Sequence, residues 1–172
     1  SSAMVNICTR RIPASITSVG TMPMMKRLRP ALFETDRRTP KQDVIDGISV
    51  YFPRCLTLGN AGEKLLGGYP MYRAALPIAR KLHAEKPFDI IHAHMLPREG
   101  HAGRLLGQAL GVPVALTVHG TDVFHYFIPG QTPWKRNIET AQGVDALMAV
   151  SSLLLSRVAP YRGEGKISRV VQ

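Results

Sequence analysis

The chain has 172 residues, about the size of one ordinary domain, so its length excludes two full domains. Hydrophobic residues make up 45% of it and charged residues 20%, which excludes a disordered or fibrous chain. Its longest apolar runs, such as 112–118, are far shorter than the roughly 20 residues of a membrane-spanning helix. Cys8 and Cys55 are too few for a disulfide framework or a four-cysteine zinc site, so we expect a soluble cytoplasmic protein.

The net charge of +10 is unevenly distributed, because residues 1–42 carry eight Lys and Arg against Glu34 and Asp36. Such a surface predicts an anionic partner, either a phosphorylated ligand or the inner face of a membrane in peripheral contact. We expect no nucleic acid, since residues 1–42 contain a single aromatic residue, Phe33. The methionine-rich basic run 22–32 has two interpretations, a membrane-surface segment or a loop whose methionines cover the core.

The first half of the chain predicts few regular elements. Residues 5–9 favour a short strand, and Gly and Pro interrupt the segment that follows. Asp46-Gly47 predicts a turn, and the alternation over 48–52 predicts a half-buried strand. Apolar residues near helical spacing over 65–85 predict one helix bent at Pro77, or two shorter helices.

The second half of the chain alternates between strands and helices. Strands are predicted at 90–94, 112–118, 144–150 and 166–171, and helices at 102–110, 133–142 and 151–158, with Gly111 as a left-handed helix cap. This order predicts an α/β fold, a Rossmann-like three-layer sandwich with a mostly parallel sheet, in a single domain over 1–172. Ligands of such sheets bind at the carboxyl ends of the strands, which here selects the loops 92–100, 119–124 and 151–152.

The loop His119-Gly120-Thr121-Asp122 places an imidazole, a glycine, a hydroxyl and a carboxylate directly after a buried strand. One interpretation is a loop that contacts a polar ligand. The other is structural, with Asp122 capping a helix and His119 bonded to backbone. The spacing alone does not separate the two.

The histidines raise the question of a metal site. His92 and His94 lie on one face of a strand, and His101, His119 and His125 follow within 31 residues of His94. No carboxylate joins them at a metal-ligand spacing, so we expect no metal. We also expect no bound nucleotide cofactor, since the chain contains neither Gly-x-Gly-x-x-Gly nor Gly-Lys-Ser/Thr.

Four segments in order, 87–94, 110–117, 119–122 and 144–151, resemble the N-terminal half of retaining, nucleotide-sugar-dependent glycosyltransferases of family 4, which have the GT-B fold. The likeness covers about residues 44–172, and 46–54 resembles the strand before that family's long helix. The family opens with a strand, a Gly-rich loop and a long helix. That opening is not recognisable here, so we expect a domain that is incomplete at its N-terminus: the chain either begins near the family's second strand or lacks residues there, and the Gly-rich acceptor loop is absent or unrecognisable. We also expect the C-terminal nucleotide-sugar domain to be absent.

The resemblance implies transfer of a hexosyl unit from a nucleotide-sugar donor to a sugar, glycan or lipid acceptor, with retained configuration and no metal. It makes His119 the catalytic residue beside the transferred sugar, with a substrate-binding set of His94, Arg98, Gly120, Thr121, Asp122 and Ser151. His94 and Arg98 would face the acceptor, and the Ser151 hydroxyl would either meet substrate or only cap a helix. The alternative function is a non-catalytic α/β module that binds an anionic small molecule or surface.

Overall fold

The structure is a computed structural model that describes residues 4–7, 40–46, 48–55 and 59–171. The basic segment 8–39, with the methionine-rich run 22–32 and Cys8, lies outside the described residues, as does any Gly-rich loop within it. The predictions for these parts therefore stay predictions.

Among the described residues, five strands form one parallel sheet in the order β1-β4-β5-β6-β7. They are β1 (Met4–Ile7), β4 (Ile90–His94), β5 (Val114–Val118), β6 (Ala146–Ala149) and β7 (Ile167–Val170). All neighbours run parallel, which confirms the Rossmann-like α/β class. β1 lies beside β4, the place of the first strand in a doubly wound sheet. The place of the second strand was one of two alternatives expected for the start of the chain, and β1 does not occupy it.

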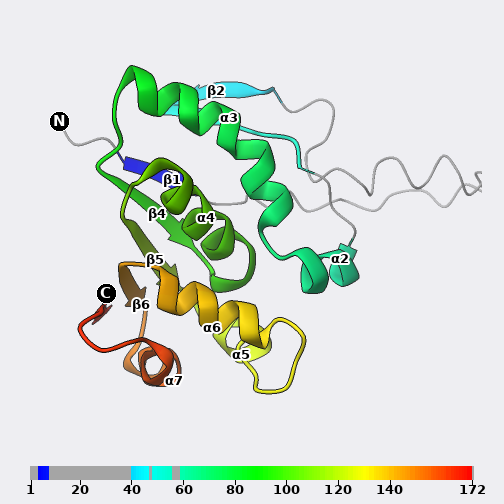
Figure 1. Ribbon diagram of the computed structural model, residues 1–172, viewed down its shortest axis with the longest axis vertical. Helices are drawn as coiled ribbons and strands as arrows, with labels where there is room; N and C mark the ends of the chain where they lie inside the picture. The colour runs from blue at the N-terminus through cyan, green and yellow to red at the C-terminus, as the bar shows by residue number, and fades with distance from the viewer. Residues whose placement is uncertain (1–3, 8–39, 47, 56–58, 172) are drawn as a thin grey trace, which may run out of the picture.

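The helices α3 (Tyr69–Glu85), α4 (His101–Leu110) and α6 (Trp134–Gly143) lie side by side over the sheet (Figure 1). α4 packs tightly on β5, because a Cβ added at Gly107 would come within 2.3 Å of Val114 Cγ2. Val114 pairs with Ile91, so Ile91 and Ala93 share the face that α4 covers. His92 and His94 alternate with them and therefore lie on the opposite face of the sheet. As predicted, α4 ends at Gly111 with φ 69°.

The remaining helices lie at the carboxyl ends of the strands or beyond β6. A π-helical turn, η1 (Leu96–Gly100), runs directly into α4, so the predicted loop 92–100 is wrong over most of its length. α5 (Thr121–Tyr126) begins within the predicted loop 119–124. α7 (Ser152–Val158) packs against β6 and β7, and the 3-10 turn η2 (Ala159–Tyr161) follows it.

Residues 69–85 form one helix, α3, with Pro77 inside it, which agrees with the single-helix alternative for this segment. The helix α2 (Gly59–Leu66) precedes it and was not predicted, and the prediction for the strand at 48–52 needs correction. A separate antiparallel hairpin joins β2 (Gln42–Ile45) to β3 (Ile48–Tyr51), and β2 was not predicted. Ile48 is 67% exposed, so the prediction of a half-buried strand is wrong at its first residue. This strand forms because it pairs with β2, and not because one of its faces is buried in the core. Such pairing leaves little periodic pattern of apolar residues in the sequence.

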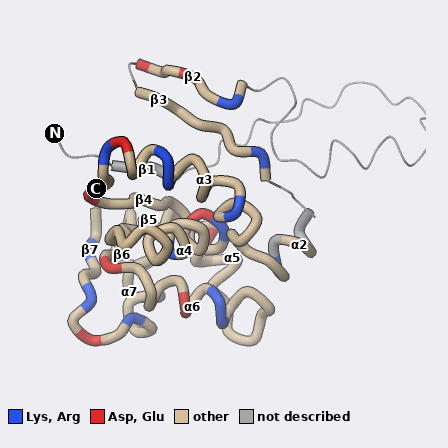
Figure 2. The backbone as a smooth tube through the Cα atoms, turned by 45° about the horizontal axis from the view of Figure 1, so that its top comes forward, with Lys and Arg blue, Asp and Glu red and all other residues tan. Residues whose placement is uncertain are grey.

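The charged residues that the structure describes lie on helices, on loops and on the outer strands, and not on the central strands of the sheet. Figure 2 shows Lys and Arg along α3, whereas β4, β5 and β6 contain no Lys, Arg, Asp or Glu. Arg73, Arg80 and Lys81 are exposed on α3, and Lys81 is 3.8 Å from Glu85. Within the ranges that the structure describes, no helix has both the length and the apolar character needed to cross a membrane.

The turn between α2 and α3 is held by a buried histidine. The Gly68 N–H donates to Nδ1 of His101 at 3.1 Å. A Cβ at Gly68 would come within 2.0 Å of the Arg98 carbonyl oxygen, so only glycine fits this close approach. Arg136 of α6 donates to the carbonyls of Lys64 and Leu65 at the end of α2. The turn is thereby fastened to both α4 and α6.

We expect His101 to make the stability of the domain depend on pH. Burial, aided by the positive charges of Arg104 and Arg136, lowers the pKa of His101 to about 4. The unfolded chain, with an ordinary histidine pKa of about 6.5, then binds a proton that the folded protein does not. The free energy of unfolding contributed by neutral His101 is fully present above pH 6.5 and falls as the pH drops toward 4.

The measurement is urea unfolding between pH 4 and 8 for the wild type and for His101→Asn. The asparagine amide oxygen can accept from Gly68 N–H near the position of Nδ1 but does not titrate. The wild type is expected to lose more stability than the variant between pH 6.5 and 4. Parallel decline of the two proteins would contradict the assignment.

Candidate functional site

Two neighbouring strands of the sheet end in histidines. β4 ends at His94, and His119 follows Val118, the last residue of β5. The parallel register pairs His94 with Thr117, which brings the two rings side by side. Nδ1 of His94 is 2.9 Å from Nε2 of His119, a hydrogen-bonding distance, and the ring centroids are 5.2 Å apart. Two histidines identified from the sequence therefore form one pair at the carboxyl end of the sheet.

A third histidine supports this pair. Nε2 of His92 is 2.8 Å from Oγ1 of Thr117, on the neighbouring strand. The centroid of the His92 ring lies 4.2 Å from that of His94, with the rings tilted by 47°. The three rings thus form a row along one face of the sheet and its end, which we call the histidine row (His92, His94 and His119).

Burial and mutual repulsion keep part of this row uncharged. Burial, and to a lesser degree the neighbouring His119, lowers the pKa of His92. The pKa of His94 is lowered by burial and then by His92 and His119. Both rings are therefore neutral at pH 7, since even an unperturbed histidine has a pKa of about 6.5. A neutral imidazole has one N–H donor and one acceptor nitrogen, so each ring has a defined direction of hydrogen bonding.

Asp122 holds together the two loops that carry the histidines. Its Oδ2 accepts from the Leu96 N–H at 3.1 Å, on the chain after β4. Its Oδ1 accepts from the N–H groups of His119 and Gly120 at 3.0 and 2.8 Å, on the chain after β5. The side chain has no exposed surface and bonds backbone N–H groups, which favours the structural interpretation, and the contact of Asp122 with substrate stays a prediction. Asp122 acts as a brace between the two loops. It lies inside α5 and accepts from N–H groups that precede it in the chain, so its role is structural but it does not cap a helix.

Two unusual backbone conformations shape the same loops. Met95, directly after His94, has φ 69° and ψ 130°, which is strained for a residue with a side chain. Both of its backbone groups are bonded, its N–H to the Thr117 carbonyl and its carbonyl to the Gly100 N–H, each at 2.8 Å. Gly120, directly after His119, has φ 127° and ψ −67°, which only glycine adopts readily. These bends turn the chain away immediately after each histidine.

The other predicted site residues lie around the histidine row. Thr121 is exposed at the first position of α5, and Gly120 is buried beneath it. Arg98 is half-buried in η1. The Ser151 hydroxyl accepts from the Leu154 N–H at 3.3 Å and caps α7, which matches the structural alternative stated for it. Contacts of Arg98, Gly120, Thr121 and Ser151 with substrate stay predictions.

Sequence reasoning missed the roles of Met95, Leu96 and Thr117. The hydroxyl of Thr117 and the backbone of Met95 and Leu96 join the site only because β4 and β5 are neighbours. A sequence signal existed for Thr117 alone, as the one polar residue in an otherwise apolar strand. Within the described part of the chain, no group of three or more His, Cys, Asp or Glu residues is arranged to hold a metal ion.

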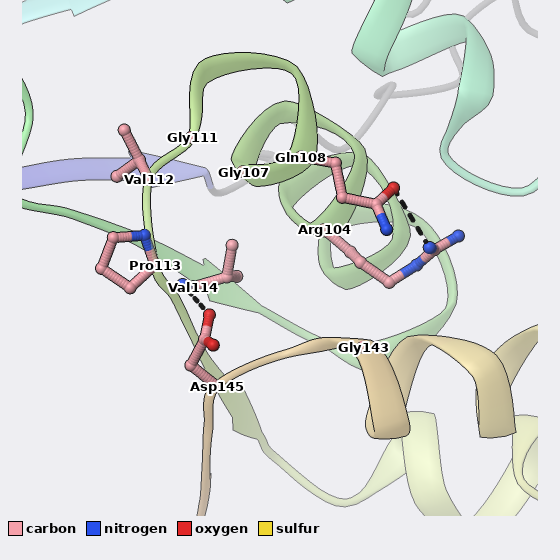
Figure 3. A pocket seen from close by; sticks show the side chains of 9 residues that line it. All are labelled: Arg104, Gly107, Gln108, Gly111, Val112, Pro113, Val114, Gly143 and Asp145. Carbon is pink, nitrogen blue, oxygen red and sulfur yellow. Dashed lines mark hydrogen bonds between the residues drawn. The ribbon is translucent and has the colours of Figure 1, made fainter.

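A cavity of about 330 Å³ lies at the opposite end of the sheet. It is lined by Val114 at the start of β5, by Asp145 just before β6, and by residues of α4 and of the turn after it. Figure 3 shows the Asp145 carboxylate accepting from the Val114 N–H at 2.8 Å, while Arg104 is directed toward Gln108 at 3.3 Å. The first of these bonds connects β5 to the chain just before β6, the second lies within α4, and both are far from the carboxyl-end loops along the strands.

A Rossmann-like parallel sheet with a braced polar loop at the carboxyl ends of adjacent strands defines a ligand-binding α/β domain. Residues 7–171 match the family of glycosyl transferase 4-like domains, and the chain belongs to this family. The resemblance to the N-terminal half of family 4 glycosyltransferases with the GT-B fold is confirmed. A comparison with curated proteins finds no match. Membership in the family indicates a sugar donor and an acceptor as partners in general.

Proposed function

We propose that this domain forms the acceptor side of a glycosyltransferase that moves a hexosyl unit from a nucleotide-sugar to a sugar, glycan or lipid acceptor. The transfer retains the anomeric configuration and uses no metal ion. The nucleotide-sugar is held mainly by a second domain that faces the carboxyl ends of the strands. Within this scheme His119 is the catalytic residue, and its ring hydrogen-bonds a hydroxyl of the transferred sugar.

The observation that carries this proposal is the bracing of the His119 loop. Asp122 accepts from the backbone N–H groups on both sides of the His119 Cα, and His94 holds one ring nitrogen. The ring itself is exposed, so it is both fixed and accessible. A preorganised donor aimed at developing charge is the arrangement by which enzymes stabilise a polar transition state. A histidine with a purely structural role gains nothing from exposure of this kind.

The test compares the isolated chain with a longer enzyme in which a nucleotide-sugar domain follows it. Each protein is mixed with a panel of nucleotide-sugars and candidate acceptors, and product is measured with its anomeric configuration. The isolated chain is expected to give no turnover, because half of the cleft is absent, and the longer enzyme to give a retained product. Sustained turnover by the isolated chain would contradict the proposal that the second domain is needed to hold the nucleotide-sugar.

The same experiment addresses the alternative of a non-catalytic module for anionic ligands. That alternative predicts no product from either protein, together with binding of a phosphorylated compound that weakens as salt is added. Contact with an anionic membrane depends mainly on the basic segment 1–42, most of which lies outside the described residues, and it stays a prediction.

A further inference from the structure

We infer that His94 is a positioning residue that fixes the tautomer of His119 and leaves Nδ1 of His119 as the nitrogen that meets the sugar. This inference rests on the proposed function for its catalytic meaning, but its structural content is independent of any activity. The resemblance implies that His94 faces the acceptor, and that contact stays a prediction. The geometry directs Nδ1 of His94 at the ring of His119.

The argument begins with the bond between the two rings. Nε2 of His119 is occupied by His94 at 2.9 Å, and among the described residues none bonds Nδ1 of His119. Two nitrogens at this distance need one proton between them, so one ring donates and the other accepts. If His94 donates, the single proton of neutral His119 lies on Nδ1. If His119 donates, its Nδ1 is an acceptor. The direction of this bond therefore sets whether Nδ1 of His119 donates to a ligand hydroxyl or accepts from one.

The next step is that His94 is itself held in place. The His92 ring packs on it with a centroid distance of 4.2 Å, and His92 is tied to Thr117 on β5. The strained turn at Met95 is bonded at both backbone groups, which fixes the end of β4. His94 is also neutral at pH 7, because burial and the adjacent rings lower its pKa. A rigid neutral imidazole is the kind of partner that selects one tautomer of a second imidazole.

The consequence concerns rate more than binding. A hydroxyl of the sugar needs either a donor or an acceptor at Nδ1, and a mixture of tautomers presents the wrong one for part of the time. A ring free to rotate also presents Nδ1 in the wrong direction. Loss of His94 should therefore reduce kcat by about 10-fold, as expected for the loss of one neutral hydrogen bond in the transition state, and change KM little.

The test uses two substitutions at His94 with a matched control. His94→Leu removes the polar contact and keeps bulk. His94→Asn places an amide near the position of Nδ1 and restores one hydrogen bond to His119. His125→Leu replaces an exposed histidine of α5 outside the histidine row. Tautomers are measured on the ¹⁵N-labelled chain from long-range ¹H–¹⁵N spectra of the imidazole rings at pH 8, and kcat and KM on the enzyme with both domains.

In the wild type and in His125→Leu, the two ring nitrogens of His119 are expected at the well-separated shifts of a single neutral tautomer. In His94→Leu the shifts should converge toward an average, and in His94→Asn they should separate again, with kcat recovering in parallel. Unchanged His119 shifts in His94→Leu, or averaged shifts already in the wild type, would overturn the inference. Absence of sugar transfer with the expected spectra would instead refute the proposed function and leave the positioning contact in place.

Discussion

Replacing His119 by alanine in an enzyme that contains this domain is expected to lower turnover by about 100-fold and to leave the fold nearly unchanged. Removal of one preorganised donor to developing charge typically costs about that much in rate. The His119 ring is exposed and has a hydrogen bond to His94, so its removal should cost at most about 1 kcal/mol of stability.

The rate per folded molecule and the thermal midpoint are measured on the same preparation. His119→Gln is the informative companion, because its amide can reach His94 near the position of Nε2 but has no polar atom near Nδ1. It should lose rate as the alanine variant does. His125→Ala, on the exposed surface of α5, should change neither quantity. A lower midpoint with an unchanged rate would make His119 a structural residue.

The second large effect is expected at Asp122, where alanine should destabilise the domain by about 3–5 kcal/mol. The Asp122 carboxylate has no exposed surface. Its removal leaves three backbone N–H groups without their acceptor, those of Leu96, His119 and Gly120. Each unsatisfied buried group costs about 1–3 kcal/mol, and partial access of water to the loops reduces the sum.

Urea unfolding at pH 7 measures this loss. Asp122→Asn should lie between the wild type and the alanine variant, because its amide oxygen still accepts while its NH₂ group faces an N–H donor. The matched control is Glu139→Ala, which removes an exposed carboxylate from α6 and should shift stability by no more than about 0.5 kcal/mol. Equal stability of the Asp122 and Glu139 variants would show that water replaces the carboxylate without cost.

The strands of the second half were predictable because burial leaves a strong pattern. Val114 to Val118 are buried on both faces, and only an apolar run rich in β-branched residues serves such a strand. Gly111 was predictable as a helix cap for a related reason, since few residues adopt its left-handed conformation. The hairpin strand Gln42–Ile45 was not predictable, because its residues are exposed and its pairing depends on the partner strand.

Within the site, the sequence identified the loop at 119–122 but left the function of its members undecided. The spacing of Asp122 allowed either ligand contact or a structural bond, and the bonds of its two oxygens favour the structural one. The Ser151 hydroxyl likewise caps α7, while its contact with substrate stays a prediction. Such outcomes depend on which backbone N–H groups lie within hydrogen-bonding distance of the side chain, and the sequence around one position does not show that.

The sequence by itself determined the α/β class, the order of the elements after residue 90, and the edge of the sheet at which the polar loops gather. These follow from local periodicity and from the handedness of crossovers, which act over short stretches of chain. Only the tertiary structure decided that His94 faces His119 and that Asp122 joins the chain after β4 to the chain after β5. Both contacts connect residues about 25 positions apart, and they exist because β4 and β5 pair in one register.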